Sequence, residues 1–358
     1  MYITFAVVTD MVCKILLVGT GLTSAVTGFI LRKTFSKGIY LVAWDKAKTA
    51  GGRLITDASP TDPNCIADLG AQYITSSQDN FTEHSVVYES LIGAKLLEPL
   101  CSKIDGMRDL PPDTKQFVAT RGMSALVKHF LFDVADEIHF EHEVIALNVE
   151  DRSWLVETKS GVRGTFDIVI LTIPIPQVLQ LIGFIQEVIS KNEKIEHNLK
   201  AVDFTSRYAL CLFFNYSVEF STGWDSKYIY DDEIFRYISI ENQKRNEQNC
   251  PSAVVFHTSV HYGAKNCNRN LRDVEHELTC RAKNLFPDWP TPAYVMCKKW
   301  EYSQVKTPYS GQPGCIILEE QPLLIAGGDS FTSSHFDGCI ISAVTLTNKV
   351  IPTVMQYT

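Results

Sequence analysis

Residues 14–45 read KILLVGTGLTSAVTGFILRKTFSKGIYLVAWD, and this stretch decides the fold. It begins with a short apolar run typical of a buried strand, turns at Gly19 and Gly21, and continues with apolar residues at helical spacing. A strand, a glycine turn and a helix in this order make a dinucleotide-binding fingerprint credible. Gly19 permits the tight turn, and Gly21 lets the backbone approach a pyrophosphate at the N-terminus of the helix.

The residues that follow extend this fingerprint. Its third glycine is replaced by Ser24, whose Cβ predicts looser packing between helix and strand. A second strand, residues 39–44, leads into Asp45, where a carboxylate can accept hydrogen bonds from an adenosine ribose; an ordinary surface aspartate also fits this position. A glycine pair that ends in Gly52 then precedes Arg53. The pair is either a plain turn or a close approach to a ligand whose diphosphate the arginine holds through two hydrogen bonds.

Composition excludes several classes of protein. The chain has 358 residues, of which 45% are apolar and 21% charged, so it has ample material for about two folded domains. Disordered, collagen-like and disulfide-stapled small proteins are excluded. The net charge is 33 − 41 = −8, and no cluster of basic residues with interleaved aromatics occurs, so we do not expect nucleic acid as a partner.

Cysteine usage and the first residues bear on the compartment. None of the ten cysteines forms a CxxC pair or lies near a histidine at zinc-finger spacing, which predicts a reducing environment and no metal site. The N-terminal apolar run is interrupted by Asp10 and Lys14 and lacks a basic leader, so neither a signal peptide nor a membrane span is expected. These features predict a cytoplasmic protein.

Several blocks of sequence resemble the renalase family, within the flavin amine oxidase superfamily. They are Trp44-Asp45-Lys46, Gly51-Gly52-Arg53, ADLGAQYIT at 67–75, TSRYAL at 205–210, ISIEN at 238–242, GGD at 327–329 and FDGCI at 336–340. The match runs from about residue 11 to 350 and implies FAD, bound without a covalent link, as the cofactor. Met11 coincides with the usual start of the family, so residues 1–11 are expected to be an N-terminal extension.

The expected fold is α/β, with a Rossmann-like FAD-binding domain of the p-hydroxybenzoate hydroxylase and amine oxidase type. The period of two in residues 207–214, 234–241, 253–260 and 294–301 predicts an interleaved, mostly antiparallel substrate domain, with a helix over 271–285. Residues 177–200 look helical. The predicted division assigns 12–75, 116–177 and 315–352 to the FAD-binding domain, and 76–115 and 178–314 to the substrate domain.

The resemblance also implies a cofactor site and a reaction. Backbone groups at the start of a helix predicted from residue 338 are expected to face the pyrimidine edge of the flavin. The expected cofactor-binding residues are Gly19, Gly21, Thr23, Asp45, Lys46, Gly52, Arg53, Gln72, Tyr73, Val144, Thr172, Gly328, Asp329, Gly338, Ile340 and Ile341. The implied reaction is oxidation of isomeric dihydronicotinamide dinucleotides (2- and 6-dihydroNAD(P)) to NAD(P)⁺, with O2 reduced to hydrogen peroxide.

Four residues are candidates for contact with the substrate. His257 shares the less apolar face of its strand with Ser259 and could project into the pocket, or could be an ordinary core or surface histidine. Arg207 could contact a phosphate or carboxamide, or form a surface ion pair. Asn242 could bind a carboxamide or cap a turn, and Trp300 could form a flat wall for an aromatic ring or lie in the core.

Two other functions stay open at this point. An FAD-dependent amine or catecholamine oxidase would need an aromatic cage and a lysine beside the flavin, for which Lys298 and Lys299 next to Trp300 are candidates. A secreted, non-enzymatic signalling ligand is the third possibility, and the resemblance makes an extracellular location possible. The sequence does not settle the oligomeric state or the choice between the NAD and NADP isomers.

Overall fold

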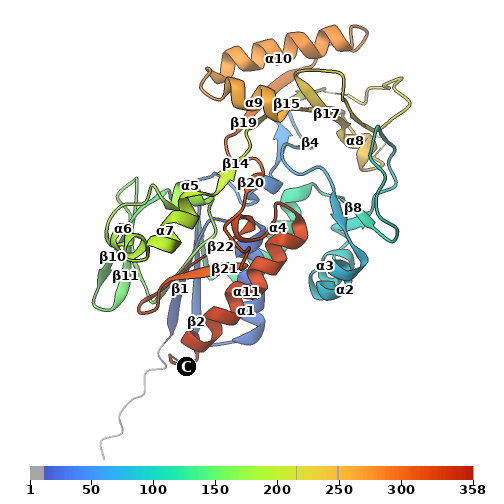
Figure 1. Cartoon of the computed structure of the whole chain (residues 1–358). Coiled ribbons are helices and arrows are strands. Elements are labelled where there is room, and N and C mark those ends of the chain that lie inside the picture. Colours follow the sequence, from blue (N-terminus) through green and yellow to red (C-terminus); the bar gives the residue numbers. More distant parts are fainter. Residues whose placement is uncertain (1–11, 215, 248–249, 358) are drawn as a thin grey trace, which may run out of the picture.

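The computed structural model describes residues 12–214, 216–247 and 250–357 (Figure 1). The expected extension over residues 1–11 lies outside the described residues. The strands form two six-stranded sheets and four smaller ones among the described residues. The arrangement is the mixed α/β fold predicted from the sequence, with a Rossmann-like nucleotide-binding part.

The first large sheet carries the nucleotide-binding part. Its order is β21 (Cys315–Glu319), β22 (Leu323–Gly327), β13 (Ile168–Leu171), β1 (Cys13–Val18), β2 (Ile39–Trp44) and β9 (Glu137–His139). All neighbours are parallel except β21, which runs antiparallel along one edge. The strands are apolar on both faces because both faces are covered, as parallel sheets require. This accounts for the continuous apolar runs that began the sequence argument.

Helices and a small sheet cover the two faces. One face packs against α1 (Leu22–Thr34), α4 (Met123–Val134) and α11 (Phe336–Val354), which lie side by side in Figure 1. The other face packs against β10 (Val144–Glu150), β11 (Ser153–Thr158) and β12 (Arg163–Phe166), together with α5 (Ile175–Val178), α6 (Phe184–Ser190) and α7 (Glu193–Lys200). The predicted helix over 177–200 is therefore three short helices, and Gly183 at φ +92° caps the start of the second.

Ser24 fits into the fingerprint without loosening it. Its buried hydroxyl lies 2.7 Å from the hydroxyl of Thr172, which follows β13, so the serine ties the first turn to the neighbouring strand. The close approach of α1 to the sheet occurs one turn later, at Gly28. A Cβ on Gly28 would lie 3.0 Å from Leu41 and 3.1 Å from Val134. The looser packing expected at Ser24 is therefore wrong, because the hydroxyl has a specific partner and Gly28 makes the tight contact.

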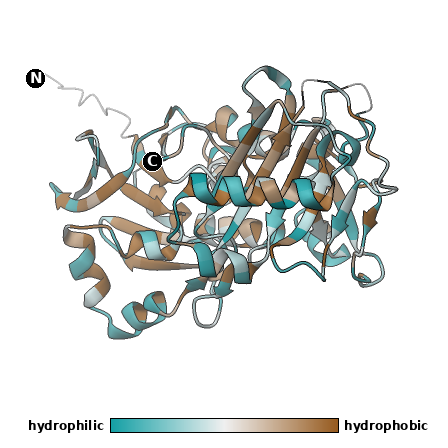
Figure 2. Ribbon diagram, turned by 90° about the horizontal axis from the view of Figure 1, so that it is seen from above, coloured by the Kyte–Doolittle hydropathy of each residue, from teal (hydrophilic) through white to brown (hydrophobic). Residues whose placement is uncertain are grey.

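The second large sheet has the order β19 (Tyr294–Trp300), β15 (Arg207–Phe213), β18 (Ala253–Thr258), β17 (Phe235–Ile240), β16 (Ser226–Tyr228) and β7 (Ile104–Asp105). It is antiparallel except for the short β7. One face packs against α10 (Leu271–Leu285), whose apolar side faces the strands and whose polar side faces outward (Figure 2). Strand β18 ends at Thr258, two residues before the predicted end, because Ser259 caps α9 (Val260–Asn266).

The remaining elements connect these layers. They are the one-turn helices η1 (Gly52–Leu54) and η2 (Asp329–Phe331), the helices α2 (Gln78–Glu83), α3 (Ser85–Gly93) and α8 (Glu241–Lys244), and the strands β3 (Thr56–Ser59), β4 (Asp62–Asp68), β5 (Ile74–Ser76), β6 (Leu97–Pro99), β8 (Lys115–Ala119), β14 (Asp203–Phe204) and β20 (Val305–Thr307). Among the described residues, no helix combines the length and apolarity needed to cross a bilayer.

The division into two domains stays a prediction, and packing suggests different boundaries. Apolar side chains between residues 181 and 202 belong to the core on one face of the first sheet. Those between residues 87 and 97 belong to the core on its other face. We therefore propose that the nucleotide-binding part extends to about residue 202 and includes most of 76–100, with the substrate part beginning near 203.

Candidate cofactor and substrate site

A cavity of about 1210 Å³ lies between the two large sheets. The carboxyl ends of β1, β2 and β13 line it on one side, and the second sheet lines it on the other. Ligands of open α/β sheets bind at this end of the strands. The cavity exceeds the roughly 300–1,000 Å³ typical of pockets for drug-sized ligands. It therefore has room for a dinucleotide cofactor together with part of a second molecule.

The glycine turns at one end of the cavity fit a dinucleotide. A Cβ built on Gly21 would meet no atom within 4 Å, so the backbone is open to the cavity there. A Cβ on Gly52 would lie 3.3 Å from the Cα of Gly21, and the Gly51 N–H donates to the Thr20 carbonyl at 3.0 Å. The first backbone bond of α1 runs from Ala25 to Gly21. The preceding N–H groups of this helix have no helical partner and suit a phosphate.

Asp45 is fixed at the end of β2 by its neighbours. Its Oδ2 accepts hydrogen bonds from the amide and the hydroxyl of Thr20, both at 2.6 Å, and its Oδ1 accepts one from the Ala47 amide at 2.8 Å. A carboxylate can accept about four hydrogen bonds. One acceptor position therefore remains on Oδ1 for a ribose hydroxyl, which is the arrangement the fingerprint needs.

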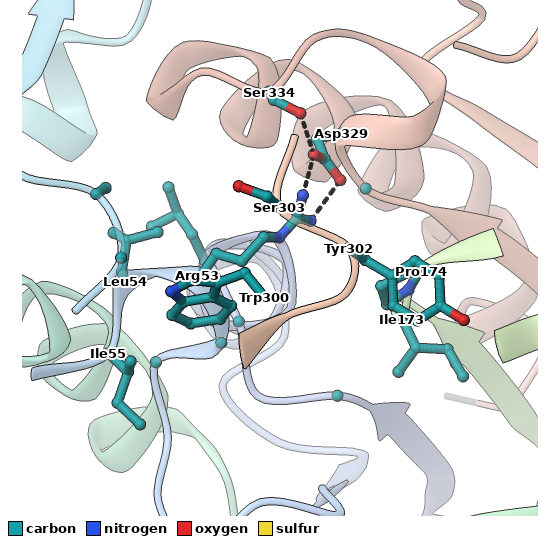
Figure 3. Close-up of a pocket in the computed structure, with 18 of the residues that line it drawn as sticks. Arg53, Leu54, Ile55, Ile173, Pro174, Trp300, Tyr302, Ser303, Asp329 and Ser334 are labelled. Atoms are coloured by element: carbon teal, nitrogen blue, oxygen red, sulfur yellow. Dashed lines mark hydrogen bonds and ion pairs between the residues drawn. The ribbon is translucent and has the colours of Figure 1, made fainter. Parts of the chain in front are cut away.

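Arg53 forms an ion pair that the sequence did not predict (Figure 3). Its two terminal nitrogens donate to the carboxylate of Asp329 at 2.5 and 2.6 Å, and the Ser334 hydroxyl donates to the same carboxylate at 2.6 Å. Burial opposes charge on both groups, but their attraction outweighs it, so the pKa of Arg53 is raised and that of Asp329 is lowered. The pair therefore joins the Gly51-Gly52 turn to η2. A diphosphate bound beside Arg53 would contact a guanidinium that is already paired with Asp329.

Most of the residues expected at the cofactor line the cavity. Besides the turns, Asp45, Arg53 and Asp329, the lining includes Thr23, Lys46, Gln72, Tyr73, Val144, Thr172 and Gly328. Their individual contacts with FAD stay predictions, which rest on the dinucleotide-binding fingerprint and on the family resemblance.

Gly338, Ile340 and Ile341 do not line the cavity. Helix α11 begins at Phe336, two residues before the predicted start, so His335, Phe336 and Cys339 face the cavity instead. A Cβ on Gly338 would lie 2.2 Å from the Ser333 carbonyl oxygen, so this glycine serves close packing. Ile340 lies in the core, and Ile341 is 38% exposed.

His257 lies on the cavity face of the second sheet, and the alternation predicted for its strand holds. Val254 and Phe256 belong to the core beneath α10, whereas Ala253 and Val255 lie on the opposite face. The Nε2 atom of His257 is 3.1 Å from Nε2 of Gln72. Burial, and then the charges of Arg207 and Lys244, lower the pKa of His257 to about 3. The ring is therefore neutral at physiological pH.

Two arginines that line the same end of the cavity have no carboxylate partner in the part of the chain that the structure describes. Among the described residues, Arg207 donates to the Thr258 carbonyl and the Gln304 side chain, both at 3.3 Å, and its buried Nε has no hydrogen-bond partner there. Burial and the nearby charge of Arg236 lower the pKa of Arg207. Arg236 lies over the Tyr230 ring at 5.4 Å and is in no described ion pair. These free donors make this end of the cavity suitable for an anion.

A β-bulge brings Arg236 into the cavity. The register of β17 against β18 shifts between Phe235 and Tyr237. Phe235 therefore lies in the core beneath α10, while Tyr237 and the bulged Arg236 line the cavity. The hydroxyl of Tyr237 is buried beside Ser226 and Ser239, and the hydroxyls of Tyr73 and Tyr228 lie 2.6 Å apart.

Of the two remaining substrate candidates, Trp300 lines the cavity and Asn242 does not. The indole of Trp300 lines the cavity, donates to the Leu69 carbonyl at 2.7 Å, and has the Lys298 ammonium 5.0 Å from its ring centre. Asn242 does not line the cavity. It lies in α8, buried, with its amide 3.4 Å from the Glu247 carbonyl, because the chain turns away from the cavity at the end of β17. The expected contact of Asn242 with a carboxamide is therefore wrong, and its alternative role in a turn fits.

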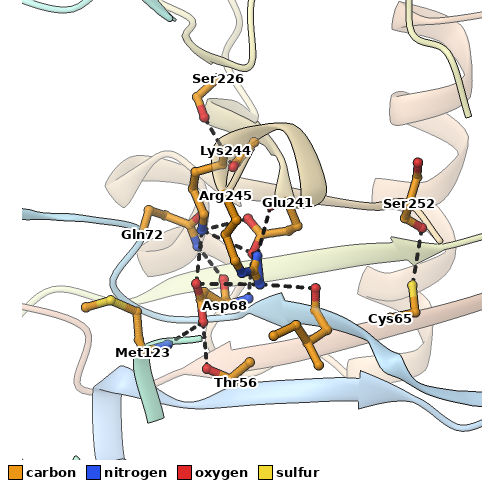
Figure 4. A network of polar contacts seen from close by, with 12 residues as sticks. Thr56, Cys65, Asp68, Gln72, Met123, Ser226, Glu241, Lys244, Arg245 and Ser252 are labelled. Carbon is orange, nitrogen blue, oxygen red and sulfur yellow. Dashed lines mark hydrogen bonds and ion pairs between the residues drawn. The ribbon is translucent and has the colours of Figure 1, made fainter. Parts of the chain in front are cut away.

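A buried charge cluster behind the cavity was missed by the sequence reasoning (Figure 4). Asp68, Glu241, Lys244 and Arg245 have side chains at most 1% exposed. The Lys244 ammonium donates to Asp68 Oδ2 at 3.1 Å and Glu241 Oε1 at 2.9 Å, and Arg245 donates to Glu241 Oε2 at 2.9 Å. Glu241 precedes Lys244 by three residues and Arg245 by four, and this helical spacing was the signal in the sequence that could have predicted the ion pairs. Asp68 is 176 residues away from Lys244 in the sequence, so no local pattern predicted its contact with the cluster.

Comparisons with known proteins agree with this geometry. The family described as flavin containing amine oxidoreductase matches residues 87–351, and the NAD(P)-binding Rossmann-like domain matches residues 17–91. Renalase of Mus musculus is 39% identical over 335 residues, which cover 93% of this chain and 97% of the mouse protein. A crystal structure assigned as a protoporphyrinogen oxidase of Exiguobacterium sp. 255-15 superposes with a TM-score of 0.71 at 10% identity, covering 95% of this chain and 99% of that one. This last likeness concerns the fold.

Proposed function

Because this chain belongs to the renalase family of flavin-containing amine oxidoreductases and is an FAD-dependent oxidoreductase, we propose that it oxidises isomeric dihydronicotinamide dinucleotides. The substrates would be the 2- and 6-dihydro isomers of NAD(P). The net reaction consumes one substrate molecule, one O2 and one proton, and yields NAD(P)⁺ and hydrogen peroxide. FAD, when bound, accepts the hydride and delivers two electrons to O2.

The residues around the glycine turns would hold the cofactor. The free N–H groups of α1 would bind its diphosphate, the remaining acceptor position of Asp45 its ribose, and the Arg53–Asp329 pair would close the site. Cys339 lines the cavity, but burial raises the pKa of its thiol to about 12. A protonated thiol is a weak nucleophile, which supports FAD bound without a covalent link. Release of the flavin by acid denaturation tests this.

The observation that carries the substrate proposal is the position in the cavity of Arg207 and Arg236, for which the described residues offer no carboxylate partner. A dinucleotide brings a diphosphate whose oxygens match guanidinium donors. A protonated amine would instead meet two positive charges of its own sign, so the arginines disfavour a catecholamine. Trp300 would provide a flat wall for the dihydropyridine ring, and the neutral His257 would hydrogen-bond to it.

The amine oxidase alternative rests on the tyrosines and lysines of the cavity. Tyr73, Tyr228 and Tyr237 could flank a substrate nitrogen, and Lys298 lines the cavity beside Trp300. Anaerobic stopped-flow absorbance at the flavin band separates the two functions. We expect rapid bleaching by 6-dihydroNAD and none by catecholamines or simple amines. Bleaching by amines alone would replace the proposal with an amine oxidase, and bleaching by neither would remove both.

A further inference from the structure

The side chain of Gln72 connects the buried charge cluster to His257. Its Oε1 accepts a hydrogen bond from the Lys244 ammonium at 3.2 Å. Its Nε2 has two hydrogens: it donates one to the Asp68 carbonyl oxygen and directs the other at Nε2 of His257, 3.1 Å away, with the Gly70 carbonyl oxygen a weaker third acceptor at 3.3 Å. Gln72 is itself buried, with 8% of its surface exposed.

These contacts fix the orientation of the amide. Lys244 can only donate a hydrogen bond, and the two backbone carbonyls can only accept one. The opposite orientation would place the Gln72 NH2 group against the Lys244 ammonium and its oxygen against the carbonyls of Asp68 and Gly70. All three contacts would then be repulsive, so Nε2 of Gln72 must be the atom that faces His257.

The orientation of the amide in turn fixes the proton on the imidazole. Because Gln72 presents an N–H donor to Nε2 of His257, that ring nitrogen must carry a lone pair, and the proton of the neutral ring must be on Nδ1. An imidazolium would place two donors against each other. No described group is hydrogen-bonded to Nδ1, and His257 lines the cavity. The free N–H therefore belongs to the part of the ring that a ligand can reach.

We infer that Gln72 is a positioning residue that holds His257 neutral, with its proton on Nδ1, so that His257 meets the substrate as a hydrogen-bond donor and not as a base. The cluster of Asp68, Glu241, Lys244 and Arg245 sets this arrangement by orienting Gln72. The inference rests on the proposed function only for the identity of the group that accepts this hydrogen bond from His257. In a dihydronicotinamide that group is the carboxamide oxygen.

The other groups around His257 support the neutral ring. Arg207 on β15 and Lys244 on α8 are positive and oppose an imidazolium. On the adjacent strand β17, Tyr237 has its ring centre 6.2 Å from that of His257, and burial raises the pKa of this tyrosine, so it stays uncharged. On β19, Lys298 pairs with Ala209, which itself pairs with His257. The carboxylates of Asp68 and Glu241 are engaged by Lys244 and Arg245, and no described carboxylate is hydrogen-bonded to the His257 ring.

The first test observes the proton directly in the FAD-loaded protein. The nine histidines are labelled with nitrogen-15, and two-bond 1H–15N correlations distinguish their tautomers. The signals of His257 are assigned as those that are missing in the His257→Asn variant. We expect a neutral ring with a protonated Nδ1 and no change of its signals between pH 5.5 and 8. A proton on Nε2, or titration within this range, would overturn the inference. No substrate is present, so the outcome is independent of the proposed reaction.

The second test uses the rate of flavin reduction by 6-dihydroNAD. Gln72→Glu retains an acceptor for Lys244 but places a carboxylate beside the ring. A neighbouring negative charge favours the imidazolium, so the pKa of His257 should rise from its parent value of about 3 and give the rate an ionisation that the parent protein lacks. Gln72→Leu should lower kcat/KM by about 3–10-fold, the worth of one hydrogen bond.

Two controls show whether Gln72 acts through His257. In a His257→Asn background, Gln72→Leu should change kcat/KM by less than about twofold, because the group it positions is gone. Gln78→Leu, at an exposed glutamine in α2, should have no effect on kinetics or tautomer. Equal losses from Gln72→Leu in both backgrounds would assign a purely structural role and contradict the inference.

Discussion

Lys244→Met should be among the most destabilising single substitutions in this chain. The substitution keeps most of the side-chain volume but removes the ammonium that contacts Asp68, Glu241 and Gln72 at 2.9–3.2 Å. Two fully buried carboxylates are then left with one cation, Arg245. Removing one partner of a buried ion pair costs about 3–5 kcal/mol, because it leaves an uncompensated buried charge. We therefore expect a loss of that size in the free energy of unfolding.

The assay is urea unfolding of the FAD-loaded protein, followed by circular dichroism and flavin fluorescence at the same protein concentration. Lys159→Met is a matched control, because Lys159 pairs with Glu143 at 3.2 Å with its side chain 72% exposed. Such a surface pair contributes about 0–1 kcal/mol.

Charge balance can be separated from the loss of contacts. The double variant Lys244→Met/Glu241→Gln leaves Asp68 with Arg245 and restores neutrality, so it should recover part of the lost stability. A cost below about 1 kcal/mol for Lys244→Met, equal to that of the surface control, would refute the reasoning. So would a double variant whose stability is the sum of the two single losses.

Three further predictions concern binding and pH. Asp45→Ala should weaken FAD retention by about 1–3 kcal/mol, measured as flavin lost on dialysis, because the ribose loses its acceptor. Arg207→Gln or Arg236→Gln should raise KM for 6-dihydroNAD but not for the corresponding phosphate-free nucleoside; equal effects on both would contradict a phosphate contact. His257 binds a proton near pH 6.5 when unfolded but only near pH 3 when folded, so stability should fall as the pH drops through this interval. His257→Asn should make that pH dependence shallower by up to about 1.4 kcal/mol per pH unit in urea unfolding curves.

The features that local spacing controls were predictable. The turn at Gly19 and Gly21, the end of β2 at Asp45 and the alternation around His257 each depend on residues within one strand and turn. Helix α11 begins two residues earlier than predicted, because the glycine of FDGC is a packing residue inside the helix and not its cap.

The rest of the site depends on contacts between distant segments. The Arg53–Asp329 pair joins residues 276 apart, and the buried cluster brings Asp68 to α8. Neither leaves a periodic pattern in the sequence. Arg236 reaches the cavity only because a bulge shifts the register of β17 by one residue. A strict alternation of faces along the strand would place Arg236 on the opposite face.

The parallel sheet is completed by a strand that lies far along the chain from its neighbour. Strand β13 ends at Leu171, but its neighbour β22 begins at Leu323, and α11 follows it. During synthesis the edge of β13 therefore stays unpaired while about 150 further residues emerge, which is a template for wrong pairing. Asp329 follows β22, so it can reach Arg53 only after this strand has been made. A cofactor site that needs the Arg53–Asp329 pair therefore stays incomplete until β22 and η2 have been made.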